Sequence, residues 1–421
     1  MANYLEMSRE ELVEEERTLQ AAYKAFQNMG LKLNMARGKP GPHQMDLAMD
    51  LFKTTDYTAA DGTDARNYGN LEGLYEARQL FGEVMGVKPE NVFVGGNSSL
   101  QLMYFLVSIG YTFGFPESPC PWSQVDHPKF LCPVPGYDRH FRITEEFGID
   151  MINVPMTPEG PDMDMVEKLA AEDPSIKGIW CVPIFSNPTG AVYDDHTVSR
   201  LARMATAAPD FRVIWDNAYV VHTLTTDFPK VPDVDTLAAE AGHPNRFLQV
   251  CSTSKITFAG AGVSFLSASA ANLDWYLGHA SIRTIGPNKV NQLAHARFFG
   301  DAEGVRAHML RHRQSVAPKF EAADAALTRR LGEYGIARWA MPEGGYFIDL
   351  EVVDGTATET VRLAKGLGVA LTPAGSAYPY GNDPDDRHIR LAPTLPPLAE
   401  VETAMDVVGL CVLLAACRAA A

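Results

Sequence analysis

Short apolar segments alternate with helical segments over residues 70–300, and no other feature of this chain constrains its fold as strongly. The apolar segments include NVFVGG, MINVPM, KGIWCVP, FRVIWD and RFLQVCS, and the helical ones include 100–111, 162–172 and 197–208. The apolar segments do not alternate with polar residues, which is typical of strands that are buried on both faces. Strands joined through helices predict an α/β fold with a mainly parallel sheet covered on both sides.

The two ends of the chain follow a different pattern. A capping box of Ser8 and Glu11 opens an N-terminal helix. After Gly304 a long polar helical stretch leads to the strand-like segments YFIDLEV and HIRLAP and to a C-terminal helix. We therefore expect two domains, a large one over residues 50–305 and a smaller α+β domain that combines residues 1–49 with residues 306–421.

Charge and composition argue against several classes of protein. The chain has 421 residues, a net charge of −16 and no long basic block, so we expect no nucleic-acid partner. Its six cysteines show no metal-ligand spacing, which indicates reduced thiols in a cytoplasmic protein without a metal site. The acidic N-terminus does not resemble a signal peptide. The longest apolar run, 407–417, is too short to span a bilayer, so we expect no membrane partner.

The segment STSKITFAGAG places one lysine, Lys255, directly after a predicted buried strand. No acidic residue occurs from Phe247 to Ala271. One interpretation is a lysine whose ammonium group extends to the surface. The other is a poorly solvated lysine, whose neutral amine can attack a carbonyl carbon.

Four other segments follow predicted strands, where folds of this kind bind ligands. GGNSS (95–99) precedes a helix, and N–H groups and hydroxyls at a helix N-terminus bind anions. Tyr137 could stack on a flat ligand, and Asn187 could donate a hydrogen bond from the turn NPTG. Asp216 could pair with a buried cation, with Tyr219 beside it. Taken alone, each segment has an ordinary interpretation as a turn, a cap or a packed side chain.

Taken in order, the five features match one kind of ligand. An anion site, a stacking ring, an amide donor, a buried carboxylate and an amine fit a flat, phosphorylated heteroaromatic aldehyde. The carboxylate would keep the ring nitrogen protonated, so that the ring withdraws electrons. In this interpretation Lys255 forms an imine with the aldehyde.

The motifs YGNLEGLYEAR, GGNSS, PGY, NPTG, DNAY, STSK, EGGYF and HIRLAP occur in this order along nearly the whole chain. With them, the chain resembles the fold-type I, pyridoxal 5'-phosphate (PLP)-dependent aminotransferases of class I/II. ARGKP and SIRTIGPNKVNQL make it most similar to the bacterial subgroup with a MocR-type aminotransferase domain, which includes aspartate aminotransferase-like enzymes. The resemblance implies transfer of an amino group between an amino acid and a 2-oxo acid by a homodimer with shared active sites.

The resemblance also implies a role for each matching residue. Lys255 would hold PLP as an aldimine and then move the substrate proton, and Asp216 would pair with the pyridinium nitrogen. Tyr219 and Asn187 would hydrogen-bond the ring oxygen, and Tyr137 would stack on the ring. The residues implied at the phosphate are Asn97, Ser98, Ser252, Ser254 and, across the dimer, Tyr68.

The resemblance places the substrate carboxylates against arginines. Arg390 would bind the α-carboxylate as a bidentate fork, with Gly38 close to it. A second carboxylate would need another cation, and the candidates are Arg37 and Arg283, each of which could instead form a surface or interface salt bridge. We expect aspartate as donor and 2-oxoglutarate as acceptor, although the sequence leaves both identities open.

One position departs from the family pattern. Many relatives carry a phosphate-binding arginine eight residues after the lysine, and here that position is Val263, so hydroxyls such as Ser264 or another cation must compensate. The alternative activity is another PLP reaction on amino acids, such as that of a β-lyase, because this fold hosts many. An effector-sensing domain of a MocR-type regulator would need a basic N-terminal domain, whereas the motifs here begin by residue 36 after an acidic helix.

Overall fold

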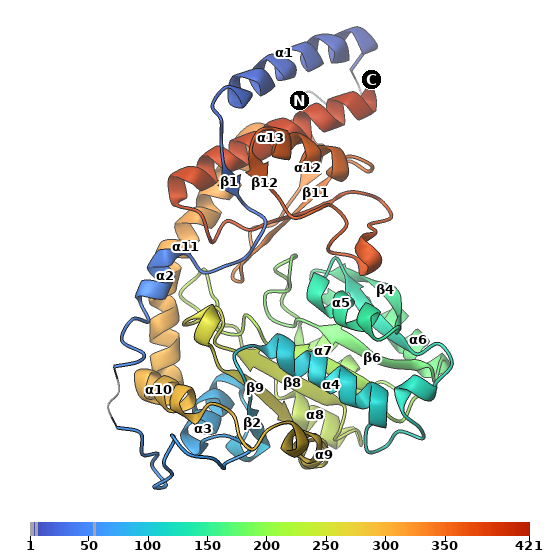
Figure 1. Ribbon diagram of the computed structural model, residues 1–421. Helices are drawn as coiled ribbons and strands as arrows, with labels where there is room; N and C mark the ends of the chain where they lie inside the picture. Colours follow the sequence, from blue (N-terminus) through green and yellow to red (C-terminus); the bar gives the residue numbers. More distant parts are fainter. Residues whose placement is uncertain (1–3, 5–6, 54–55) are drawn as a thin grey trace.

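The computed structural model describes residues 4, 7–53 and 56–421 and contains two regions built on separate sheets (Figure 1). The large sheet has the strand order β2-β9-β8-β7-β6-β3-β4-β5. Its central strands β4, β3, β6, β7 and β8 pair in parallel, whereas β9 runs antiparallel to both of its neighbours. The expected α/β fold with a mainly parallel sheet is confirmed. The eight strands are β2 (Val92–Val94), β3 (Lys129–Val134), β4 (Asp150–Thr157), β5 (Gly160–Pro161), β6 (Ile176–Cys181), β7 (Arg212–Asp216), β8 (Phe247–Ser252) and β9 (Ser264–Ala268).

Helices cover both faces of the large sheet. Phe130 and Ile214 pack under one set of helices, and their chain neighbours Leu131 and Val213 pack under the other, because successive side chains of a strand point to opposite faces. The first set is α4 (Ser99–Phe113), α5 (Asp138–Glu146) and α9 (Ala270–Arg283). The second set is α6 (Met163–Glu172), α7 (Asp195–Arg203) and α8 (Val234–Glu240). Two further helices, α3 (Tyr75–Met85) and α10 (Lys289–Phe299), pack near β2 and β9.

The helix expected over residues 197–208 ends earlier than predicted, at Arg203. Ala208 precedes Pro209, and a residue before proline disfavours the helical conformation. The Met204 carbonyl instead accepts a hydrogen bond of 2.6 Å from Arg246. Met204 itself is non-helical, with φ −55° and ψ 144°, so the chain leaves the helix at this residue.

A smaller antiparallel sheet of order β10-β11-β13 forms the second region, together with the two ends of the chain. The capping box at Ser8 and Glu11 is present and opens α1, which lies beside the C-terminal helix α13 (Figure 1). The long helix α11 extends from α10 to this region. The remaining elements are α1 (Arg9–Gln27), β1 (Leu33–Asn34), α2 (Pro42–Asp46), α11 (Ala302–Leu331), β10 (Ala337–Arg338), β11 (Ile348–Val352), α12 (Ala357–Gly366), β12 (Val369–Ala370), β13 (His388–Leu391), α13 (Leu398–Ala420) and the 3₁₀ helices η2 (Pro89–Asn91), η3 (Trp122–Gln124), η4 (Ala259–Ala261) and η5 (Pro379–Gly381).

Helix α13 is the one helix among the described residues that is long and apolar enough to cross a membrane. In its most apolar stretch, 72% of the residues are buried inside the protein. It packs against α1, α11 and α12, and its side chains form much of the core of the small-sheet region. Its apolar composition is therefore accounted for by core packing.

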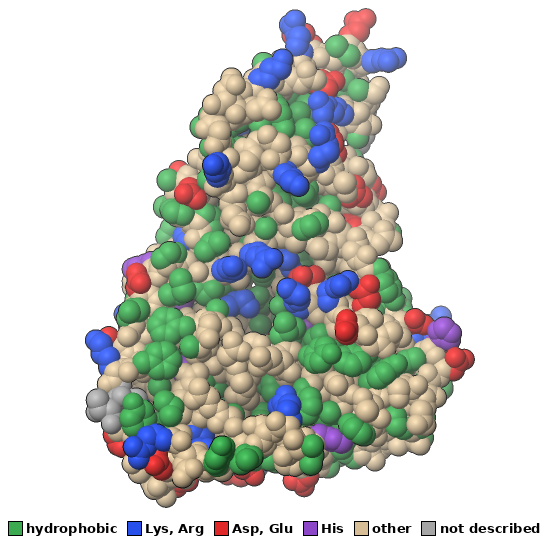
Figure 2. Space-filling view, in the orientation of Figure 1, with side chains coloured by type: hydrophobic (Ala, Val, Ile, Leu, Met, Phe, Trp, Pro, Cys, Tyr) green, Lys and Arg blue, Asp and Glu red, His purple; other side chains and the backbone are tan. Residues whose placement is uncertain are grey.

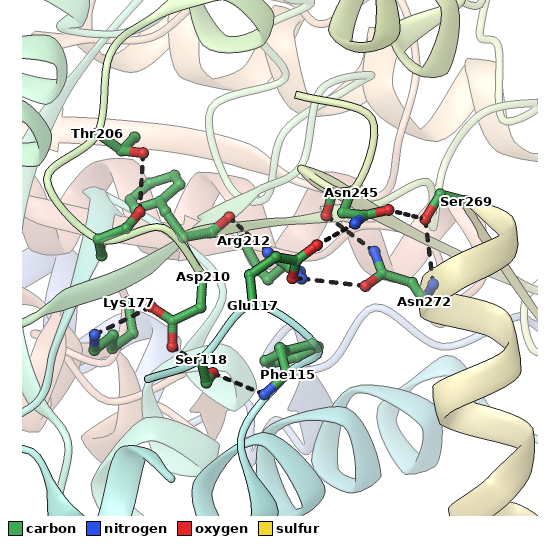
Figure 3. A network of polar contacts seen from close by, with 12 residues as sticks. Phe115, Glu117, Ser118, Lys177, Thr206, Asp210, Arg212, Asn245, Ser269 and Asn272 are labelled. Atoms are coloured by element: carbon green, nitrogen blue, oxygen red, sulfur yellow. Dashed lines mark hydrogen bonds and ion pairs between the residues drawn. The ribbon is translucent and has the colours of Figure 1, made fainter. Parts of the chain in front are cut away.

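A buried polar network lies at the amino ends of β6 and β7 (Figure 3). The Lys177 ammonium lies 3.1 Å from the Asp210 carboxylate, which also accepts a hydrogen bond of 2.8 Å from the Trp122 indole. Arg212, the first residue of β7, donates to Glu117. These ions are paired, as buried charges must be, and they lie at the strand ends opposite to Asp216. We therefore assign them a structural role.

Candidate active site

The carboxyl ends of the central strands face a cavity of about 520 Å³ between the two sheet regions. We call it the active-site pocket. Segments that follow β3, β6, β7 and β8 form one wall, and the small-sheet region with the 36–39 segment forms the other. Figure 2 shows Lys and Arg side chains gathered around the hollow between the two regions. The lining residues are Ala36, Arg37, Gly38, Lys39, Tyr137, Asp138, Arg139, Asn187, Tyr219, Lys255, Phe347, Thr372, Pro373, Ser376 and Arg390.

Lys255 follows β8 and is half-buried in the active-site pocket. Its Nζ lies 4.9 Å from the centroid of the Tyr219 ring and forms no hydrogen bond or ion pair with any described residue. Its backbone carbonyl accepts a hydrogen bond of 3.2 Å from the Tyr346 hydroxyl, which holds the lysine loop in place. The amine therefore faces the cavity, as required for attack on a bound carbonyl group.

Asp216 ends β7 and is buried beside His140. His140 Nε2 donates a hydrogen bond of 3.0 Å to Asp216 Oδ2, whereas Asp216 Oδ1 has no hydrogen-bond partner among the described residues. The imidazole stacks on Trp180 with ring centroids 4.4 Å apart and an interplanar angle of 9°. A buried carboxylate oxygen without a partner is costly. Asp216 Oδ1 can therefore accept a hydrogen bond from an N–H or O–H group of a ligand.

Tyr137, Asn187 and Tyr219 surround the same part of the pocket. The Tyr137 ring lies 5.0 Å from that of His140 in an edge contact. Burial raises the pKa of Tyr137 to about 12 and that of Tyr219 well above its ordinary value. Both phenols therefore stay protonated near neutral pH and can donate hydrogen bonds. The buried Asn187 side chain is held near Arg390, whose Nη1 lies 3.4 Å from Asn187 Oδ1.

The four residues expected at a phosphate lie close together beyond β2 and β8. Ser254 Oγ lies 3.1 Å from Ser252 Oγ and donates to the Asn97 carbonyl at 3.0 Å. Ser98 is the N-cap of α4, yet its side chain makes no capping hydrogen bond. Its hydroxyl and the N–H groups of the first helical turn are therefore available to an anion.

The neighbouring cavity of about 250 Å³ is lined by neutral residues within the described part of the chain, Val263 among them. Val263 is buried, and its N–H donates to the Thr253 hydroxyl at 2.8 Å. Ser264, suggested from the sequence as a substitute for the missing arginine, is fully buried, and its Oγ has no partner among the described residues. An atom added as Cβ on Gly95 would lie 2.8 Å from that Oγ, so the hydroxyl faces the protein interior.

Arg390 lies on β13 with its side chain 9% exposed. Its Nη1 donates to Asp138 Oδ1 at 2.9 Å, and its guanidinium carbon lies 5.0 Å from the centroid of the Phe347 ring. Its Nε is buried and has no partner among the described residues. Nη1 is therefore engaged by Asp138, whereas Nε and Nη2 form no hydrogen bond with the described residues, so the guanidinium retains donors for a carboxylate.

The remaining sequence candidates divide into two groups. Gly38 and Arg37 line the active-site pocket, and a Cβ on Gly38 would lie 2.5 Å from Phe347 Cζ. Arg283 and Tyr68 do not line the pocket of their own chain. Arg283 lies 3.9 Å over the Phe105 ring, and the Tyr68 side chain is 80% exposed.

Sequence reasoning missed several residues that the structure brings to the site. Asp138, Arg139 and His140 follow Tyr137 directly and form the first turn of α5. Phe347 was contained in the quoted motif EGGYF without an assigned role. One signal in the sequence could have found Asp138–His140. A helix that begins directly after the aromatic residue at a strand end must place its first turn at the ligand-binding edge of the sheet.

Comparison with known proteins gives the family. The sequence model of the family described as aspartate amino-transferase matches residues 7–421. An aspartate aminotransferase of Corynebacterium glutamicum is 56% identical over 394 residues, which cover 93% of this chain and 91% of that protein. A protein of Mycolicibacterium smegmatis described as a putative aminotransferase is 53% identical and covers 99% of both chains.

Solved structures agree with this result. The crystal structure of an aspartate transaminase from Corynebacterium glutamicum matches with a TM-score of 0.98 and 53% identity, over 100% of both chains. An α-aminoadipate aminotransferase from Thermus thermophilus, complexed with N-(5'-phosphopyridoxyl)-L-leucine, shares the fold with a TM-score of 0.73 at 23% identity, over 91% of this chain and 93% of that one. This chain therefore belongs to the aspartate amino-transferase family and is an aminotransferase, an enzyme that acts on amino acids and oxo acids.

Proposed function

We propose that this chain is a PLP-dependent aminotransferase that moves the amino group of an acidic L-amino acid, aspartate foremost, to 2-oxoglutarate. One observation carries the proposal. Lys255, Arg390 and Tyr137 line the same pocket, and Asp216, whose Oδ1 has no partner among the described residues, is hydrogen-bonded to His140, which contacts the Tyr137 ring. An amine, a buried carboxylate and a carboxylate-binding guanidinium are the three groups that this reaction requires of the protein.

The residues of the pocket fit PLP. Asp216 Oδ1 is buried and lacks a hydrogen-bond donor among the described residues, and the protonated ring nitrogen of PLP would supply one. His140 occupies the other oxygen and so fixes the direction in which Oδ1 faces. Tyr137 would cover the ring face, and Tyr219 and Asn187 would hydrogen-bond the ring oxygen.

The phosphate would lie at the N-terminus of α4. Asn97 and Ser98 would bind it from that end, and Ser252 and Ser254 from the end of β8. These donors are neutral, and the position of the family's arginine is the buried Val263. Hydroxyl and backbone donors, together with the helix dipole, would thus replace a counter-charge supplied by this chain.

When bound, PLP withdraws electrons from the Cα of the amino acid, so that its proton becomes acidic. Lys255 would supply the amine that holds the cofactor, and the same amine would carry the proton removed from Cα. Arg390 and the Gly38 segment hold the α-carboxylate, which orients the Cα–H bond toward Lys255. Asp216 would keep the ring nitrogen protonated.

Several finer assignments belong to this proposal. Aspartate is supported by the name of the Corynebacterium glutamicum relative. We further propose the MocR-type subgroup, a cytoplasmic enzyme, and domain boundaries at 50–305 and at 1–49 with 306–421. The six cysteines, of which five are buried, form no disulfide among the described residues, in keeping with a reducing compartment.

The cofactor attachment is tested by chemistry on the purified protein. We expect a yellow protein in which borohydride reduction fixes the cofactor on Lys255, as located by peptide mass spectrometry. Attachment to a different lysine, or no bound cofactor after reconstitution, would contradict the proposal. A panel of amino donors with 2-oxoglutarate then identifies the substrate, and release of ammonia without transfer would indicate a lyase instead.

A shared active site is proposed because Tyr68 is 80% exposed and does not line the pocket of its own chain. In a homodimer, Tyr68 would reach the phosphate of the other site. Mixing Lys255→Ala chains with Tyr68→Phe chains should restore activity, because one site of each heterodimer then carries neither change. No recovery in a demonstrated heterodimer would contradict shared sites.

A further inference from the structure

The active-site pocket is positively charged although the protein carries a net charge of −16. Besides Lys255 and Arg390, its lining contains Arg37, Lys39 and Arg139, and Asp138 is the one acidic residue among the described lining residues. Asp138 is already paired with Arg390 at 2.9 Å. The pocket therefore holds more positive charge than the α-carboxylate of an amino acid requires, which favours a substrate with a second carboxylate.

Among the positively charged residues of the pocket, Arg139 lies where its charge does not stabilise its own helix. It occupies the first turn of α5, where a positive charge opposes the helix dipole. It is exposed and forms no ion pair or hydrogen bond with any residue in the described part of the chain. Arg142, one turn later on the same helix, is in contrast paired with Glu145 at 2.6 Å.

The position of Arg139 is fixed from both sides. The preceding residue, Asp138, contacts Arg390, and the following residue, His140, contacts Asp216 at 3.0 Å. The backbone of Arg139 is therefore fixed beside both contacts, and Arg139 lines the same pocket as Arg390. Its guanidinium can form a bidentate contact with a carboxylate in the same pocket.

The other candidate cations are less well placed. Arg37 and Lys39 flank Gly38 in a tight turn, in which the Lys39 N–H bonds the Arg37 carbonyl at 2.9 Å. Both residues line the pocket, but in the described part of the chain neither they nor their sequence neighbours hydrogen-bond Arg390 or Asp216, unlike the neighbours of Arg139. Arg283 is engaged by Phe105 and does not line this pocket.

We propose that Arg139 binds the distal carboxylate of a dicarboxylic amino acid and thereby sets the specificity of the enzyme. This inference rests on the proposed reaction with an acidic substrate. Arg390 binds the α-carboxylate and Arg139 binds the distal one. The Asp138–Arg390 contact fixes Arg390 relative to the first turn of α5. Monocarboxylic donors make the Arg390 contact alone.

The test compares Arg139→Ala and Arg139→Lys with the matched control Arg142→Ala in the PLP-loaded enzyme. Removing a charge-assisted contact should lower kcat/KM for aspartate by roughly tenfold to a hundredfold, with a change of less than about threefold for alanine. Arg139→Lys should recover part of the loss. Arg142→Ala should match the wild type on both substrates.

A binding measurement separates this inference from the proposed function. Calorimetric titration with succinate and with butyrate needs no turnover, and Arg139→Ala should weaken succinate binding about tenfold or more and leave butyrate unchanged. An unchanged succinate affinity, or a selective loss in Arg37→Ala or Arg283→Ala instead, overturns the role of Arg139. Failure of the wild type to transaminate any amino donor refutes the proposed function, whatever Arg139 binds.

Discussion

Replacing Gly38 with alanine should impair the active-site pocket without unfolding the protein. The new Cβ would lie 2.5 Å from Cζ and 2.9 Å from Cε1 of Phe347, whereas carbon atoms in contact lie about 3.5–4.0 Å apart. The ring has little room to turn aside, because it is 7% exposed, packs against Tyr219 and lies under the Arg390 guanidinium. The 37–39 turn must therefore move by about 1 Å to restore a normal contact.

The consequence should fall mainly on catalysis. A displacement of about 1 Å in groups that position a substrate costs on the order of a hundredfold in rate. Overpacking of this kind costs roughly 1–3 kcal/mol of stability when the surroundings are rigid. Because the turn borders a cavity into which it can relax, we expect a stability loss near the lower limit. We expect kcat/KM for aspartate to fall about a hundredfold.

Steady-state kinetics and urea unfolding measure the two effects separately. The control is Gly278→Ala on α9, where an added Cβ meets no atom within 4 Å. That change should stabilise the protein by about 0.5–1 kcal/mol, as expected for an exposed helical glycine, and leave kcat/KM unchanged. Wild-type activity in Gly38→Ala would refute the proposed contact. Unfolding of Gly38→Ala would show that the turn supports the fold rather than the site.

Two further predictions concern stability. Asp210→Ala should cost about 3–5 kcal/mol in urea unfolding, because it leaves the buried Lys177 ammonium unpaired. Burial alone would raise the pKa of Asp210, but hydrogen bonds from Ser118 and Trp122 and the Lys177 charge lower it. Its contribution is therefore present above about pH 4 and lost as the pH falls through the lowered value, so wild type and variant should converge in acid. The pKa of His388 is raised. Burial alone would lower this pKa, but the Asp349 carboxylate, 3.0 Å away, raises it more strongly. The destabilisation by His388→Gln should thus be full below about pH 6.5 and shrink at higher pH, and equal losses at pH 6 and pH 9 would contradict this pairing.

The central strands were predictable because burial on both faces leaves them apolar throughout. β7 and β8 read RVIWD and FLQVCS, and helices cover both of their faces. β9 (SFLSA) was not predicted, because its direction depends on its pairing with β2 and β8. β2 is distant in the sequence, and a glycine-rich loop joins β8 to β9. The short pair β1 and β12 likewise forms only when the two ends of the chain meet.

Residues that directly follow strands were predictable as site candidates, since the fold places all such positions at one edge. Lys255, Asn187, Tyr219 and Tyr137 line one pocket as this rule requires. Asp138–His140 escaped detection because DRH at a helix start resembles a solvated helix face. Only the packed structure shows that adjacent side chains there contact Arg390 and Asp216.

The first turn of α5 links the parts of this site. Tyr137, which lines the active-site pocket, precedes this turn, Asp138 contacts Arg390, and His140 contacts Asp216. Its register is set by β6, because His140 stacks on Trp180 and the Trp180 indole donates to Thr144, one turn further along the helix, at 2.8 Å. The strand that leads to Asn187 therefore also positions the groups that would hold the ring nitrogen and the substrate carboxylates. With the proposed roles, a change that shifts the backbone of this turn should alter both substrate specificity and cofactor electronics, whereas removal of the Arg139 side chain alone should alter only specificity.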